Sequence, residues 1–187
     1  MESLQVTSEG AEFVTLTEAK AHLVVDYSDD DTLISSLITA SRKWCEHRTN
    51  RFFTPTNVTL SRNGFSSMMP LKYKPILEIT SIEYDDEATG NTLAADQYQL
   101  DAYNNYVVRA YGVSFPSTRY HWDSVRINYR VGYASGSPEV VAVPEDVKRA
   151  SLLIIGDLYE HREKQQDIML YENTTAEMLI SNYRVYE

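Results

Sequence analysis

The sequence predicts an α+β protein in which a small helical bundle, formed by N-terminal and C-terminal helices, carries an antiparallel β insertion between them. Apolar residues recur at helical spacing before residue 50 and again after residue 143 of the 187-residue chain. Residues 57–133 instead alternate between apolar and polar side chains. Helices from the two ends must meet to bury their apolar faces, so the strands are left as an insertion beside the bundle.

The N-terminal segment is predicted to contain an arm and two helices. Residues 1–14 show no clear periodicity, so we expect a flexible arm. Thr17 can cap a short helix over residues 17–25. A long helix over residues 29–49 follows, with three aspartates at its positive N-terminal end and a Ser28–Asp31 pattern that resembles a capping box. The residues that keep its helical rhythm are Ile34, Leu37, Ile38, Ser41, Trp44 and Cys45.

The middle of the chain has the two-residue period of β-strands. Asn-Gly, Gly-Asn and Asn-Asn turn signals separate stretches that are rich in Val, Ile, Thr and Tyr. Asn104 and Asn105 are expected at the turn of a hairpin. We expect about five short antiparallel strands, in VTLSRNGF, ILEITSIEY, YQLDAY, YVVRAYG and SVRINYRVGY.

A second long helix is predicted over residues 144–163. Pro144 suits the first helical position, and the two acidic residues after it lie at the positive end of the helix dipole. One apolar face holds Val147, Ala150, Ile154 and Leu158. Further apolar residues lie well around the helix from that face: Leu152, Leu153, Ile155 and Tyr159. Such a helix must be covered on more than one side, either by a second subunit or, alternatively, by the β insertion of its own subunit.

The expected domain organisation follows from these elements. The arm over residues 1–14 precedes a single domain over residues 15–163, and a C-terminal arm over residues 164–187 completes the chain. Within that arm Thr174 and Glu177 form a second capping-box pattern, which predicts a short helix.

Composition excludes several classes of protein. Net charge is −10 with a pI near 4.9, so the overall field does not favour tight binding to nucleic acid. No apolar run approaches the roughly 18 residues of a membrane span, and the start MESLQVTSEGAEF lacks a signal peptide, so we expect a soluble cytosolic protein. Cys45 is the single cysteine, which excludes an intramolecular disulfide and a multi-cysteine zinc site.

The motifs of catalysis and cofactor binding are absent from the sequence. The four histidines form no zinc-binding spacing, and the seven glycines form no dinucleotide or phosphate loop. Cys45 lies in a helical apolar stripe, which favours packing over nucleophilic chemistry. The aspartates of residues 29–31 lack the spacing of a calcium loop, so helix capping explains them. We therefore predict no catalytic residue, no metal site and no cofactor.

The loop NGFSSMMPLKYKP leaves two interpretations open. Phe65, Met68 and Met69 could fold back onto the sheet, or they could form a hydrophobic loop that contacts a partner. Lys72 and Lys74 are too few for a nucleic-acid patch.

Three stretches together resemble the head-tail connector proteins of tailed phages, also called adaptor or head-completion proteins. The first is VTLTEAKAHLVVDYSDDDTLISSLITASRKWCEHRTNRFF, with a short helix, an aspartate-rich cap and a long helix. The second is SVRINYRVGYASGSPEVVAVPEDVKRASLLIIGDLYEHRE, and the third is the tail EMLISNYRVYE. The resemblance covers about residues 14–185. Val24 and the pair Ser181-Asn182 depart from the family pattern, where a basic residue and a proline are common.

The resemblance implies a virion protein at the head–tail junction, made in the host bacterial cytoplasm. Such proteins form a homo-oligomeric ring, usually dodecameric, beneath the portal protein. The ring continues the channel through which DNA passes as cargo and provides the docking surface for a tail-completion or stopper protein. An acidic, non-catalytic oligomeric interaction module, such as a tail-terminator-like ring protein, is the alternative function.

The resemblance also suggests where subunits meet. A closed ring needs two different contact surfaces on each subunit, so the second side of the 144–163 helix is expected to contact a neighbour. Aromatic and arginine side chains dominate such contacts. The candidate oligomer and portal interface residues are Trp44, Arg48, Tyr159, Arg162, Leu179, Tyr183 and Arg184. The last three belong to the C-terminal arm, which is expected to reach the portal or an adjacent subunit.

Overall fold

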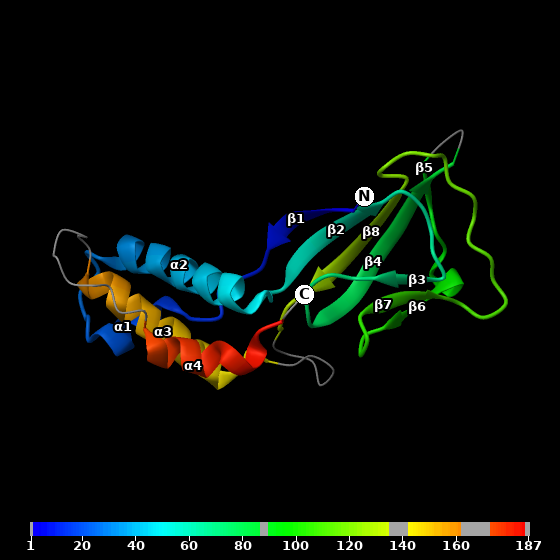
Figure 1. The fold of residues 1–187 in the computed structure, drawn as a ribbon. Helices are drawn as coiled ribbons and strands as arrows, with labels where there is room; N and C mark the ends of the chain where they lie inside the picture. The colour runs from blue at the N-terminus through cyan, green and yellow to red at the C-terminus, as the bar shows by residue number, and fades with distance from the viewer. Residues whose placement is uncertain (1, 87–89, 135–141, 162–172, 186–187) are drawn as a thin grey trace. The chain divides into compact units, whose positions relative to one another are not determined.

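Helices and strands are segregated into two units in the computed structural model, which describes residues 2–86, 90–134, 142–161 and 173–185 (Figure 1). The sheet unit is drawn from residues 1–10 and 54–133, and the helical unit is drawn from residues 11–53 and 134–187. The α+β prediction is confirmed. A single domain over residues 15–163 was expected, whereas the chain passes between two units at three points.

The described part of the sheet unit contains two antiparallel sheets. The order in the larger sheet is β1-β2-β8-β4-β5. These strands are β1 (Ser3–Glu9), β2 (Thr56–Arg62), β8 (Val125–Val131), β4 (Ile76–Asp85) and β5 (Gly90–Thr92). The smaller sheet has the order β3-β7-β6 and consists of β3 (Met68–Pro70), β7 (Tyr106–Arg109) and β6 (Tyr98–Asp101), with a 3-10 turn η1 (Ala95–Gln97) before β6.

Strand β1 corrects the prediction of a flexible arm over residues 1–14. It pairs antiparallel with β2, where Leu4 lies opposite Leu60 and Val6 opposite Val58. Leu4 and Val6 thereby extend the apolar face of β2. Two apolar residues at alternate positions are too few for periodicity to distinguish a strand from coil. The sequence alone therefore does not predict β1.

The larger sheet has one apolar face and one polar face. On the apolar face, Leu60 and Ile82 both pair with Ile127, and all three side chains are fully buried. On the polar face, the Thr59 hydroxyl donates to the Asn128 side-chain oxygen at 2.7 Å, and the Asn128 amide donates to the Ser81 hydroxyl at 2.9 Å. These cross-strand bonds hold β2, β8 and β4 in register.

The predicted hairpin joins β6 and β7. Asn105 adopts a φ of +61°, a left-handed conformation that asparagine tolerates better than most residues. Leu100 pairs with Val107 across the hairpin. The structure confirms this hairpin and its Asn104–Asn105 turn.

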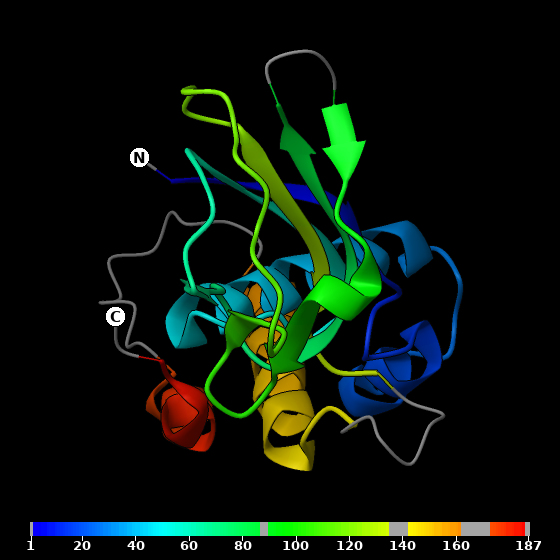
Figure 2. The same ribbon diagram turned by 90° about the vertical axis from the view of Figure 1, so that its right-hand side faces the viewer.

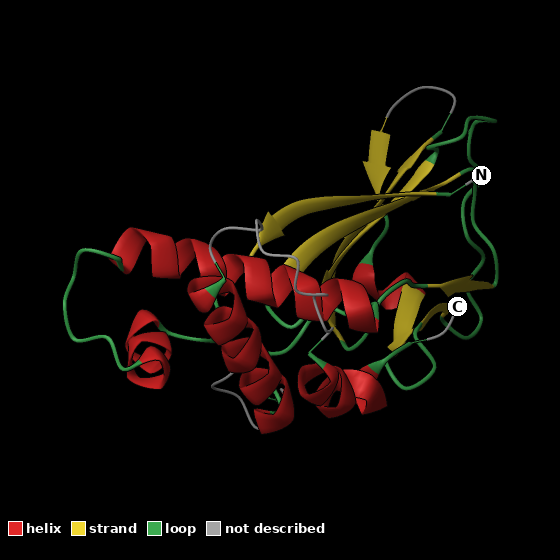
Figure 3. Cartoon of the chain, turned by 60° about the vertical axis from the view of Figure 1, so that its left-hand side comes forward, coloured by secondary structure: helices red, strands yellow, loops and turns green. Residues whose placement is uncertain are grey.

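The helical unit contains four helices among its described residues. These are α1 (Leu16–Leu23), α2 (Asp31–Thr49), α3 (Glu145–Glu160) and α4 (Thr174–Ile180), and a 3-10 turn η2 (Ser181–Tyr183) follows α4. Helix α3 lies between α1 and α4 (Figures 2 and 3), and α2 packs against all three. The buried cluster between α1, α2 and α3 consists of Val14, Ala19, Ile34, Ile38 and Ile155.

Two helix starts differ from the predicted ones because other side chains act as caps. Thr15, and not Thr17, caps α1: its hydroxyl accepts a bond from the Glu18 backbone N–H, and the Glu18 carboxylate accepts one from the Thr15 N–H. Asn173, and not Thr174, caps α4 through a bond from the Ala176 N–H.

The starts of α2 and α3 also differ from the expected positions. Asp30 precedes α2 without a side-chain capping bond, so the predicted Ser28–Asp31 capping box is wrong. The Asp31 carboxylate instead lies 2.6 Å from the Lys20 ammonium, which joins α1 to α2. Pro144 lies one position before the first helical residue of α3.

Gly132 allows two segments of the sheet unit to approach very closely. Its φ is +107°, and a Cβ atom at this position would lie 2.1 Å from the Thr54 carbonyl oxygen. At Gly10, a Cβ atom would lie 2.7 Å from the Pro55 carbonyl oxygen. Both glycines are close to points where the chain passes between the units, and both pack against residues 54–55.

Gly132→Ala should therefore lower the free energy of unfolding by about 3 kcal/mol, because it combines an unfavourable φ with a backbone clash. Gly112→Ala is a matched control, since Gly112 has a φ of +76° and a Cβ atom there would have no other atom within 4 Å, and about 1 kcal/mol should be lost. Urea unfolding followed by circular dichroism measures both losses. Equal losses would show that the Thr54 backbone moves aside.

A buried ion-pair network connects α2 to Glu12, which precedes α1, and to Phe53, which follows α2. The Arg42 side chain is 3% exposed; its Nε donates to Glu12 at 2.8 Å, and one terminal nitrogen donates to Glu46 at 2.8 Å. The second Glu46 oxygen accepts a bond from the Phe53 N–H at 3.0 Å. The Thr39 hydroxyl donates to Glu12 at 2.9 Å.

Arg42→Met should lower the free energy of unfolding by about 3–5 kcal/mol, because it leaves buried carboxylate charge without its cation. Adding Glu46→Gln removes one of these charges and keeps an oxygen for the Phe53 N–H. The double variant should therefore recover part of the loss in thermal unfolding. A double variant less stable than Arg42→Met alone would contradict this account.

Candidate assembly surface

The apolar sides of α3 are largely covered within the helical unit. Val147, Ala150 and Ile154 are buried as predicted, and α1 and α2 pack along the helix. Helix α4 of the same chain packs against α3 as well, so a neighbouring subunit is not needed to cover the second side. Among the large apolar side chains of α3, Leu158 is the exposed one, at 40%. The sequence does not predict that α4 covers α3, because α4 is short and was expected to belong to an undocked C-terminal arm.

Trp44 and Arg48 lie one turn apart on α2 and contact each other. The Arg48 guanidinium carbon is 5.6 Å from the centre of the Trp44 ring, within the range of a cation–π interaction. An Arg48 terminal nitrogen also lies 3.0 Å from a Glu177 carboxylate oxygen on α4. Both predicted interface residues are half-buried, and Arg48 joins α2 to α4.

The C-terminal segment of described residues is docked and is not a free arm. Arg51 Nε donates to the Tyr183 carbonyl at 2.5 Å, and Arg184 Nε donates to the Arg48 carbonyl at 2.9 Å. The Val185 N–H donates to the Thr49 carbonyl at 2.9 Å. The last two bonds satisfy carbonyls at the C-terminal end of α2, which have no intrahelical partner. Residues 173–185 are thus held on their own chain, and the expected contact of this segment with another protein stays a prediction.

Tyr159 also makes bonds within its own chain. Its hydroxyl donates to the Asp30 carboxylate at 2.6 Å and lies 3.1 Å from the Tyr27 hydroxyl. The bond to Asp30, followed by the one to Tyr27, raises the pKa of the Tyr159 phenol. The ring packs against the buried cluster of the helical unit. Arg162, predicted beside Tyr159 at the interface, lies outside the described residues.

The two interpretations of the Phe65–Met69 loop apply to different residues. Phe65 stacks on Phe115 with ring centres 4.7 Å apart, and Met69 is fully buried, so both fold back onto the sheet unit. Met68 is 54% exposed and remains available to a partner. The alternation follows from β3, where successive side chains point to opposite faces.

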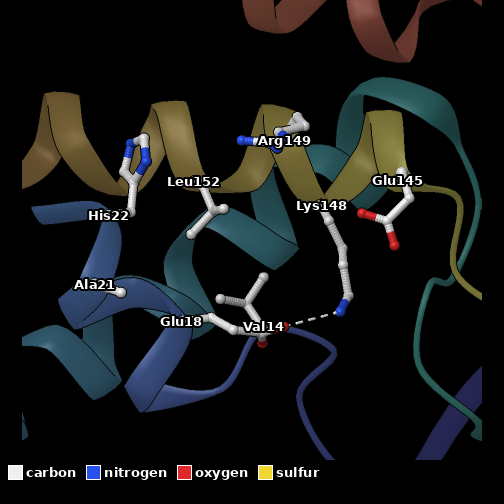
Figure 4. Close-up of a pocket in the computed structure, with 8 residues that line it drawn as sticks. All are labelled: Val14, Glu18, Ala21, His22, Glu145, Lys148, Arg149 and Leu152. Atoms are coloured by element: carbon white, nitrogen blue, oxygen red, sulfur yellow. Dashed lines mark hydrogen bonds and ion pairs between the residues drawn. The ribbon is translucent and has the colours of Figure 1, made fainter.

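A groove of about 440 Å³ lies between α1 and the first half of α3, on the side of α3 away from α4 (Figure 4). Its lining combines the apolar residues Val14, Ala21 and Leu152 with the charged or polar residues Glu18, His22, Glu145, Lys148 and Arg149. The sequence does not predict this groove, because periodicity does not indicate which sides of a helix remain uncovered.

An ion pair spans the groove. The Lys148 ammonium lies 3.2 Å from the Glu18 carboxylate. The hydrogen bond from the Thr15 backbone N–H lowers the pKa of Glu18 most, and the bond from the Thr15 hydroxyl comes next. The nearby Lys148 ammonium also lowers this pKa. Glu18 therefore stays ionised and is unsuited to proton transfer near neutral pH.

The remaining candidates for chemistry are structural. Burial raises the pKa of the Cys45 thiol to about 12, so the reactive thiolate is scarce. Within the described ranges, no three His, Cys, Asp or Glu side chains are grouped as metal ligands. None of the helices in these ranges is both long and apolar enough to cross a membrane.

Comparisons with known proteins identify the family. A family model for head completion proteins matches residues 12–175. The chain belongs to the head completion protein family. Its relative "Head completion protein gp6" of Enterobacteria phage HK97 is 43% identical over 42 residues. That match covers 22% of this chain and spans only 39% of gp6.

Solved structures of gene transfer agent (GTA) particles share the fold. A chain from the neck of an empty GTA particle, computed with C6 symmetry, is 19% identical, with a TM-score of 0.75 over 99% of this chain and 96% of that chain. A chain from the neck of a native GTA particle, computed with C12 symmetry, is 20% identical, with a TM-score of 0.72 over 98% and 96%. Membership of the head completion family gives this protein a structural role at the head–tail junction of a bacteriophage virion.

Arg51→Ala should loosen the docked C-terminal segment of this head completion protein. Loss of one charge-assisted bond removes about 1.5–3 kcal/mol, which lowers protection roughly 10- to 150-fold. Hydrogen exchange at the Val185 amide, which bonds to Thr49, measures the effect. Arg149→Ala removes an exposed arginine from α3 and should leave this amide unchanged. Equal protection in both variants would mean that Arg51 does not hold the segment.

Proposed function

We propose that this protein assembles as a ring, dodecameric in the virion, beneath the portal protein. The ring completes the phage head, continues the DNA channel and provides the docking surface for a tail-completion or stopper protein. The family match over residues 12–175 is the observation that carries this proposal. The likeness of the whole fold to neck chains from particles computed with C6 and C12 symmetry supports a cyclic assembly.

The charge of the chain supports a channel that does not retain DNA. The helical unit contains 17 acidic and 10 basic residues, and the sheet unit contains 10 and 7. Both units are therefore net acidic, so neither neutralises phosphate as a DNA-binding domain does. DNA is passing cargo in this proposal. The role is assembly and not catalysis, and the protein acts in the virion after synthesis in the host cytoplasm.

The C-terminal corner, formed by the last turns of α2 and the docked residues 173–185, is the proposed portal-side surface. Trp44, Arg48 and Leu179 are half-buried there, and Arg184 is exposed. Half-buried aromatic and arginine side chains that are already ordered lose little conformational freedom on binding. Met68, exposed in the sheet unit, is the proposed contact for the next protein of the tail.

Native mass spectrometry with and without purified portal tests the proposal. We expect about twelve copies on each portal ring, in line with the C12 symmetry used for a structurally similar neck. Free subunits can remain monomeric, because assembly on a template lowers the entropic cost of association. A chain that never joins its portal, at concentrations where both proteins are folded, would rule out the proposed ring.

A further inference from the structure

Two surfaces of the helical unit lie on opposite sides of α3. The groove between α1 and α3 opens on one side (Figure 4), and α4 lies on the other (Figure 2). Both surfaces belong to one compact unit, so their arrangement is fixed by the packing of α3 against α1 and α4. A closed ring needs two different surfaces on opposite sides of each subunit.

The outer face of α4 carries an exposed methionine. Ala176 and Ile180 are buried and lie one helical turn apart, so Met178, two residues from each, points to the opposite face. Its side chain is 74% exposed. A long, unbranched thioether adapts to irregular apolar surfaces, which suits a contact that forms only on assembly.

The outer face of α4 is also free of net charge. The exposed residues here are Thr174, Thr175 and Met178 of α4 and Ser181 and Asn182 of the following turn η2. Glu177, the acidic residue of this helix, is directed to Arg48. In a helical unit with seven more acidic than basic residues, this is a surface that another acidic copy can approach without repulsion.

The groove matches this face in size and charge. Its apolar side chains are Val14, Ala21 and Leu152, and its volume of about 440 Å³ accommodates a protruding side chain. Its rim holds two acidic residues, Glu18 and Glu145, and two basic ones, Lys148 and Arg149. The balanced rim gives the groove no net charge, like α4 and unlike the unit as a whole.

We propose that the outer face of α4 in one copy docks in the α1–α3 groove of a second copy, with Met178 as the residue that enters the groove. This inference rests on the proposed ring and specifies its subunit contact. The contact is head-to-tail, because each copy offers its groove on one side of α3 and its methionine on the other. Met178 was not among the interface residues that the sequence suggested.

Cysteine cross-linking tests the contact directly. Ala21 is exposed at the groove, and Met178 is exposed on α4, so Ala21→Cys and Met178→Cys place one thiol on each surface. The native Cys45 is fully buried with a raised pKa and does not compete. The double variant, assembled on purified portal and oxidised, should give covalent oligomers larger than dimers on a denaturing gel.

The controls use matched substitutions. Each single variant should remain monomeric on the gel, and a mixture of the two single variants should give covalent dimers but nothing larger. Met68→Cys with Ala21→Cys moves the second thiol to an exposed methionine of the sheet unit and should give no ladder.

The outcomes distinguish a failure of the proposed contact from a failure of the proposed ring. Rings seen by native mass spectrometry, without cross-linking of the Ala21→Cys, Met178→Cys variant, would overturn this contact and leave the proposed ring intact. An equal ladder from the Met68→Cys control would also overturn it. Absence of any oligomer on the portal would overturn both the ring and the contact.

Discussion

The ion-pair network of Arg42 is the interaction on which the helical unit depends. A buried guanidinium is costly unless it is fully paired, and Arg42 bonds to both Glu12 and Glu46. Glu12 lies just after the chain enters the helical unit, and Glu46 binds the N–H of Phe53, the last residue before the chain leaves it. Arg42 thereby orders the helical-unit side of two of the three points at which the chain passes between the units.

The same helix organises the C-terminal corner. Its last carbonyls receive bonds from the segment after α4, and Arg48, which lies over the Trp44 ring, pairs with Glu177 on α4. Residues that the sequence suggested for contacts between subunits thus stabilise contacts inside one subunit. The two roles are compatible, because a side chain that is already held in place is a better binding surface than a flexible one.

The sequence predicted the elements whose signals are long and repetitive. The 19 residues of α2 and the alternating strand β8 were predicted from their periods alone, and the hairpin from its paired asparagines. It did not predict β1, whose pairing with β2 is a long-range contact, or the choice of Thr15 as the cap of α1. The α1–α3 groove depends on how helices pack, which one-dimensional patterns do not record.

The three passages of the chain between units affect how the protein can be made. The sheet unit contains its final strand once residue 131 has been synthesised, whereas α3 and α4, which cover α2, come from the last part of the chain. A nascent or prematurely terminated chain therefore leaves the apolar side of α2 open. In the proposed ring, a chain that stops before α3 and α4 lacks both the groove and the exposed methionine of the proposed subunit contact.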